Sequence, residues 1–121
     1  MDVETDGDQV LGSAGQALAV EWYEGEGYEI LERNWSRREG EISLISRRGR
    51  TVAFCEVVTG SADAASSATE AVLPAKQRRI RRLGARWLTE LTPAAGRSLV
   101  DLRFDIAVAS GGEIDVVMSA F

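Results

Sequence analysis

The chain has 121 residues, a formal net charge of −5, a single cysteine and no histidine. This length suits one domain with its own hydrophobic core, the single Cys55 excludes an internal disulfide, and the lack of histidine excludes Cys-His and Ser-His-Asp catalysis. No apolar run approaches the roughly 20 residues that cross a membrane, and the acidic start is unlike a signal peptide. We therefore expect a cytoplasmic protein in which a flexible acidic N terminus, residues 1–10, precedes one domain over residues 11–121.

The first predicted element is a helix over residues 11–26. Apolar side chains recur there at spacings of three and four, which places one stripe against the core: Leu11, Ala14, Leu18 and Trp22. Gly25 and Gly27 end the helix. A strand over residues 28–35 follows.

Two further strands are predicted over residues 41–46 and 51–58, and a polar turn joins them into a hairpin. Side chains alternate along a strand, so Glu41 and Ser43 share one face of the first strand, while Glu56 and Val58 share one face of the second. The positions 43, 56 and 58 should therefore converge. Cys55 lies on the face opposite Glu56 and is expected to pack in the interior.

A polar loop over residues 59–69 leads to a second helix over residues 74–91, and two strands follow over residues 102–109 and 113–118. The order helix, three strands, helix, two strands favours an antiparallel meander with helices packed on the sheet. The strand after the second helix should return through a crossover and lie parallel to an inner strand. Trp22, Trp35 and Trp87 are expected in the core or at its rim.

Basic residues concentrate on the second helix, although the chain is acidic overall. Residues 1–32 carry nine acidic and no basic side chains, whereas residues 33–86 carry twelve basic and five acidic ones. Five basic side chains lie opposite the apolar stripe of the helix or at its edge: Lys76, Arg78, Arg79, Arg82 and Arg86. A local positive field attracts a polyanion whatever the net charge, so we predict that this ridge binds nucleic acid. The alternative is an ordinary solvated helix face.

The hairpin also carries a motif that points to a family. The segments "GEISLI" (residues 40–45) and "VAFCEVV" (residues 52–58) resemble the "GEIDLI" and "VFVEVKT" pair of the YraN-type family of proposed endonucleases, relatives of Holliday-junction resolvases in the PD-(D/E)xK nuclease superfamily. The segments "LGSAGQALAVEWYEGEGYEILERNW", "EAVLPAKQRRIRRLGARWL", "RFDIAV" and "SAF" extend the resemblance over nearly the whole chain. It implies an α/β, restriction-endonuclease-like fold with a mixed sheet, built as helix, three-strand meander, helix and two strands.

Three of the four polar site positions implied by the resemblance are exchanged in this chain. Ser43 stands where the family has an aspartate, Val58 where it has a lysine and Gln16 where it has a glutamate, so that only Glu56 is unchanged. A neutral hydroxyl is a poor ligand for Mg²⁺, and valine neither activates a water nor carries a proton. We interpret Glu56 as the remnant of a catalytic site; the alternative is a strand carboxylate paired with an arginine. Glu41 is the second carboxylate that could be recruited to hold a metal weakly.

These observations predict a nuclease-fold protein that binds branched or duplex DNA and whose metal-dependent phosphodiester cleavage is impaired or lost, with no cofactor. The first alternative is an active endonuclease that uses Mg²⁺ held by Glu41 and Glu56. The second alternative is a protein-interaction module, acting for instance through a homodimer as in junction resolvases. Divalent-metal binding and a cleavage assay on a four-way junction distinguish the three.

Overall fold

The computed structural model describes residues 3–60, 72–91 and 100–121, without the side chains of residues 3–13 and 91. Within these ranges the elements are α1 (Val3–Gly25), β1 (Glu29–Arg37), β2 (Gly40–Arg48), β3 (Thr51–Thr59), α3 (Pro74–Leu91), β4 (Asp101–Ser110) and β5 (Glu113–Val117). Neither described helix combines the length and the apolar character that crossing a membrane requires. Most of the expected polar loop over residues 59–69 lies outside the described residues.

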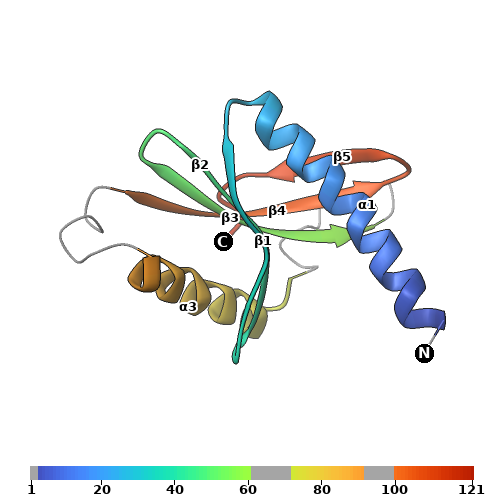
Figure 1. Cartoon of the computed structure of the whole chain (residues 1–121), viewed down its shortest axis with the longest axis horizontal. Coiled ribbons are helices and arrows are strands. Elements are labelled where there is room, and N and C mark those ends of the chain that lie inside the picture. Colours follow the sequence, from blue (N-terminus) through green and yellow to red (C-terminus); the bar gives the residue numbers. More distant parts are fainter. Residues whose placement is uncertain (1–2, 61–71, 92–99) are drawn as a thin grey trace.

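The five strands form one mixed sheet in the order β1-β2-β3-β4-β5 (Figure 1). β1, β2 and β3 are an antiparallel meander, β4 runs parallel to the central β3, and β5 returns antiparallel to β4. The chain passes from β3 through α3 to β4, because parallel neighbours require such a crossover connection. The expected α/β fold with a mixed sheet is therefore confirmed.

The two helices lie on opposite faces of the sheet, and alternate side chains of β3 and β4 belong to two separate core clusters, one on each face (Figure 1). The core under α3 is aromatic: Phe54 stacks on Phe104 with ring centroids 5.3 Å apart and meets Trp87 edge-on at 5.7 Å. The core under α1 contains Tyr23 and the buried Cys55. The three tryptophans are buried or half-buried, as predicted for core or rim residues.

α1 differs from the prediction in its start and in its buried stripe. It begins at Val3, so the segment expected to be a flexible acidic N terminus is helical from that residue; the helix dipole favours acidic residues near such a terminus. The buried stripe runs through Gly15, Ala19 and Tyr23, whereas Ala14 of the expected stripe is exposed. A Cβ atom on Gly15 would lie 3.1 Å from a side chain of β4, so small residues let α1 approach the sheet closely.

α3 has the predicted bounds and begins with Pro74, a residue suited to the first helical position because it lacks a backbone N–H. Its apolar stripe is buried against the sheet at Ile80, Leu83 and Trp87. A Cβ atom on Gly84 would lie 3.1 Å from the Phe104 ring, so the glycine permits a close approach between helix and sheet. This packing leaves the basic side chains of α3 on its outer face and along its edges.

Candidate functional site

A pocket of about 210 Å³ lies where the open end of the β2–β3 hairpin meets the first half of α3. Besides two apolar residues of α3, its lining combines two carboxylates, two basic side chains, one hydroxyl and one glycine: Glu41, Glu56, Lys76, Arg79, Ser43 and Gly40. Gly40 has a φ angle of +149°, and a Cβ atom there would lie 3.3 Å from the Cδ atom of Arg79. Glycine at this position therefore lets the hairpin and the arginine stem lie close together.

Ser43 and Glu56 face each other across β2 and β3, as predicted. Leu44 pairs with Cys55 in the antiparallel register. Ser43, one residue before Leu44, therefore lies opposite Glu56, one residue after Cys55. The Ser43 hydroxyl donates a hydrogen bond to Glu56 Oε1 at 3.3 Å and accepts one from the backbone N–H of Val57 at 3.2 Å. The serine therefore joins the two strands at the carboxylate.

Gln16 and Val58 do not complete the cluster in the way the sequence predicted. The Nε2 group of Gln16 donates to the backbone carbonyl of Ser43 at 2.8 Å and to Asn34 Oδ1 at 3.0 Å, so this side chain contacts β2 through its backbone. Val58 is half-buried against the aromatic core and is not among the residues that line the pocket. Of the four positions exchanged or kept from the family motif, only Ser43 and Glu56 line the pocket, so the predicted convergence does not include Val58. The aliphatic side chain of Val58 gains more from apolar packing than from a polar pocket.

Glu56 is buried, with 9% of its surface exposed. Burial raises the pKa of its carboxyl above the usual range, because the charged form loses hydration. The ammonium group of Lys76, whose Nζ lies 3.6 Å from Glu56 Oε1, and the Ser43 hydroxyl oppose this shift, while the charge of Glu41 adds to it. The partner of Glu56 is thus a lysine of α3 and not the arginine that the alternative interpretation required.

Replacing Glu56 by glutamine should raise the free energy of unfolding at pH 7 by about 0.5–2 kcal/mol, since glutamine keeps the shape without burying a charge. Because the pKa of Glu56 is raised, the folded state binds a proton more readily than the unfolded chain. The free-energy cost of burying the charged Glu56 side chain is therefore fully present above the pKa of Glu56 in the folded state. This cost disappears as pH falls below the pKa of about 4.3 that a glutamate has in the unfolded chain. Urea unfolding of the wild type and the variant at pH 7 and at pH 4 measures the gain in stability and its loss at low pH.

Glu41→Gln provides the matched control, because Glu41 is an exposed carboxylate of the same pocket. It should change the free energy of unfolding by less than about 0.5 kcal/mol. Equal gains in the two variants, or a gain in Glu56→Gln that persists at pH 4, would show that burial of the Glu56 charge is not the cause.

The pocket residues do not match the ligand set of a divalent metal. Mg²⁺ takes near-octahedral oxygen ligands, with carboxylates among them. Glu56 Oε1 already contacts the Ser43 hydroxyl and the Lys76 ammonium group, and Glu41 lies exposed, accepting a hydrogen bond from the Ser36 hydroxyl at 3.2 Å. In the described ranges no three Cys, Asp or Glu side chains are grouped to hold one ion. A second buried carboxylate is thus what the donor set lacks.

The basic ridge of α3 is divided by contacts within the protein. Arg86 pairs with Glu39 at 2.6 Å and with Glu90 at 2.7 Å, and Lys76 pairs with Glu56. Three exposed arginines of the predicted ridge have no carboxylate partner in the part of the chain that the structure describes, and we call them the free arginines of α3: Arg78, Arg79 and Arg82. The charges of these three side chains, unlike those of Lys76 and Arg86, are not balanced by a carboxylate among the described residues.

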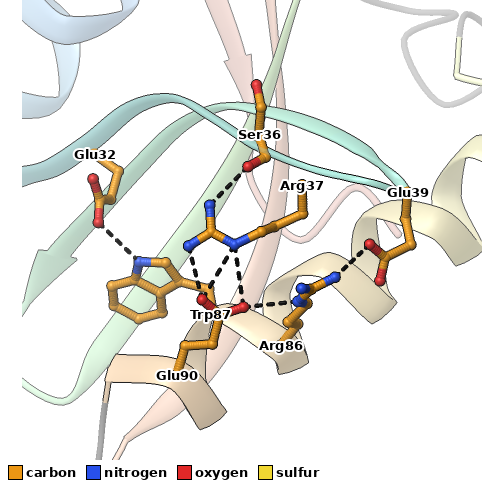
Figure 2. Close-up of polar contacts among 7 residues, drawn as sticks. All are labelled: Glu32, Ser36, Arg37, Glu39, Arg86, Trp87 and Glu90. Atoms are coloured by element: carbon orange, nitrogen blue, oxygen red, sulfur yellow. Dashed lines mark hydrogen bonds and ion pairs between the residues drawn. The ribbon is translucent and has the colours of Figure 1, made fainter.

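An ion-pair network ties the tip of the β1–β2 hairpin to the second half of α3 (Figure 2). Arg37 pairs with Glu90 at 2.7 Å, and the shared Arg86 links Glu90 to the hairpin tip. Hydrogen bonds from these two arginines hold the pKa of Glu90 at about 2. Trp87 Nε1 adds a hydrogen bond to Glu32 at 3.3 Å. Exposed ion pairs contribute little singly, so we interpret the network as a positioning device for the hairpin.

Comparison with known proteins places the chain in a family. A family model described as "Uncharacterised protein family UPF0102" matches residues 15–109. The chain belongs to the UPF0102 family. A UPF0102 protein of Frankia casuarinae is 47% identical over 100 residues, covering 83% of this chain and 81% of the relative, and one of Rhodococcus jostii is 38% identical over 116 residues, covering 92% and 95%. UPF0102 is the YraN-type family, so the resemblance of the motifs is confirmed.

Two residues that line the pocket of this UPF0102 chain were predicted to bind nucleic acid and not to form part of the pocket. Lys76 and Arg79 were assigned to the ridge of α3, whereas the structure shows them lining the pocket. Each precedes a buried residue of the apolar stripe by four positions, Ile80 and Leu83 respectively, and therefore lies along the edge of that stripe. Basic residues at a stripe edge reach over the rim of the sheet, which is the signal that could have identified them.

Proposed function

We propose that this chain is a cytoplasmic nuclease-fold protein that binds nucleic acid, with branched or duplex DNA as its ligand, and whose metal-dependent phosphodiester cleavage is impaired or lost. The observation that carries the proposal is the environment of Glu56, the buried carboxylate of the pocket, which is paired with Lys76 and Ser43. Metal-assisted cleavage needs anionic ligands to hold the ion and to lower the pKa of a bound water. The hydroxyl of Ser43 and the ammonium group of Lys76 are not anionic and therefore do not supply such ligands.

The free arginines of α3 support the nucleic-acid part of the proposal. They lie in or beside the pocket, on a helix where Lys76 and Arg86 are paired with carboxylates and Arg81 lies over the Phe104 and Phe121 rings. The planar guanidinium group forms paired hydrogen bonds with phosphate oxygens and stays charged at any physiological pH. Contacts of this kind position a duplex without reading its bases, so we expect affinity that depends little on sequence.

The wild-type protein should show no Mg²⁺- or Mn²⁺-dependent cleavage of four-way junction, duplex or single-stranded DNA. The triple variant Gln16→Glu, Ser43→Asp, Val58→Lys restores the family residues and should gain weak Mn²⁺-dependent nicking. The gain should be small, because Val58 packs against the core and a misplacement of about 1 Å can reduce a rate roughly 10²-fold. End-labelled junctions on denaturing gels measure both proteins.

Adding Glu56→Ala to the triple variant is the control, since it should abolish any regained nicking. Glu41 and Glu56 line the same pocket, which is the observation that favours the alternative of an active endonuclease. Cleavage by the wild type that requires metal and disappears in Glu56→Ala would establish that alternative and end the proposal of lost activity.

A further inference from the structure

Lys76 stands between the buried carboxylate and the open pocket. Its Nζ atom lies 3.6 Å from Glu56 Oε1, the same oxygen that accepts the Ser43 hydroxyl at 3.3 Å. The Glu56 side chain is 11% exposed, whereas the Lys76 side chain is 44% exposed. An ammonium group has three N–H donors, so contact with one carboxylate oxygen leaves others for a ligand that enters from the pocket.

A divalent ion on Glu56 Oε1 would lie next to the ammonium group of Lys76. Such ions bind carboxylate oxygens at about 2.0–2.6 Å, which would bring the ion within a few ångströms of the ammonium group. Like charges at that separation repel each other even in a hydrated site. Ser43 adds no negative charge that could compensate. The charge of Lys76 therefore weakens the binding of a divalent metal at this carboxylate.

The same geometry suits a phosphate group. Arg79 lines the pocket together with Lys76 and has no carboxylate partner in the described part of the chain. The two cations balance the charges of Glu41 and Glu56 without any bound ion. The remaining donors of the ammonium group and the guanidinium fork then match the oxygens of a phosphodiester, and charge-assisted hydrogen bonds of this kind are the strong ones.

We propose that Lys76 is the built-in cation of this pocket: it weakens the binding of a divalent metal at Glu56 and, together with Arg79, binds a phosphate group of nucleic acid directly. The phosphate part rests on the proposed function, whereas the effect of Lys76 on metal binding does not. Nucleic-acid binding by the wild type is accordingly independent of divalent metal.

Calorimetric titration with Mn²⁺ tests the effect on metal binding without nucleic acid. The proteins are the wild type, Lys76→Gln, the charge-keeping Lys76→Arg, and Arg78→Gln, which removes one charge from α3 outside the pocket lining. Lys76→Gln should bind Mn²⁺ at least about tenfold more tightly than the wild type, because a repelling charge next to Glu56 is gone. Lys76→Arg and Arg78→Gln should match the wild type. Unchanged Mn²⁺ affinity in Lys76→Gln overturns the inference.

Fluorescence anisotropy with labelled duplex DNA, at matched ionic strength in EDTA and in Mn²⁺, tests the phosphate part. The wild type should bind equally in both. Lys76→Gln should bind about tenfold more weakly in EDTA and recover part of this loss in Mn²⁺, whereas the loss in Arg78→Gln should not depend on metal. A wild type that binds no DNA would overturn the proposed function and the phosphate part together, while the calorimetric result would still decide the role of Lys76.

Discussion

Replacing Asp105 by alanine should lower the free energy of unfolding by about 3–5 kcal/mol, the range found when one partner of a buried ion pair is removed. Asp105 is fully buried in β4. Its carboxylate accepts hydrogen bonds from the Tyr23 hydroxyl at 2.6 Å, from two nitrogens of Arg103 at 2.8 and 2.9 Å, and from the backbone N–H of Ser119 at 3.0 Å. One side chain thus connects α1, β4 and the segment after β5.

The loss is large because alanine leaves the donors without an acceptor in the interior. Arg103 would keep only its hydrogen bond to the Tyr28 hydroxyl at 2.8 Å, and the buried Tyr23 hydroxyl would lose its carboxylate acceptor and keep only its weaker contact with Cys55. Urea unfolding followed by tryptophan fluorescence measures the change. Asp101→Ala is the control, since Asp101 is an exposed aspartate of the same strand and should change the value by less than about 0.5 kcal/mol. If Asp105→Ala lowers the free energy of unfolding no more than Asp101→Ala does, the hydrogen bonds of Asp105 do not contribute measurably to stability.

The register of the β2–β3 hairpin could be predicted because local features determine it. The two strands are separated by a short polar turn in which Gly49 adopts a φ angle of +61°, a conformation that favours glycine. Alternation of side chains then places Ser43 opposite Glu56 without knowledge of any tertiary contact. The central part of the site therefore follows from the sequence, and the crossover through α3 follows from the order of the elements.

The partners of the basic residues could not be predicted in the same way. Arg86 pairs with Glu39, 47 positions earlier in the chain, and this pairing depends on how α3 crosses the hairpin. Lys76 reaches Glu56 for the same reason. Helical spacing alone groups Arg86 and Lys76 with the free arginines. The spacing predicts which face of the helix a residue lies on, but it does not predict which strand or hairpin lies next to that face.

The buried stripe of α1 was predicted one position away because hydrophobicity alone was considered. Leu18 and Trp22 are half-buried, while Gly15 and Ala19 are buried, and a Cβ atom on Gly15 would lie 3.1 Å from a side chain of β4. A helix that packs closely on a sheet gains dispersion contacts along its whole length, and small residues permit this approach. Tyr23 then becomes fully buried and forms its hydrogen bond with Asp105, which a count of apolar residues does not anticipate.

Replacing the three free arginines of α3 together, Arg78→Ala, Arg79→Ala and Arg82→Ala, should weaken binding to duplex or junction DNA by about 100-fold at roughly 0.1 M salt, if each phosphate contact contributes about 1 kcal/mol. The slope of log K against log[salt] should become shallower by about 3, since roughly 0.9 counterions are no longer released for each lost contact. The loss should be similar for different DNA sequences, because phosphate contacts carry no base information. Anisotropy titrations at several salt concentrations measure all three quantities.

Two controls separate the position of the charges from their number. A second triple variant, Arg33→Ala, Arg47→Ala and Arg50→Ala, removes the same charge from exposed sites outside α3 and should weaken binding far less. Arg86→Ala removes an arginine that is already held by Glu39 and Glu90, so it should reduce stability by about 0.5–1 kcal/mol and leave affinity within about threefold of the wild type. Equal losses in the two triple variants would mean that net charge, and not the outer face of α3, attracts the polyanion. Unchanged DNA affinity in the α3 triple variant would show that the outer face of α3 does not bind DNA, and would favour the alternative of a protein-interaction module.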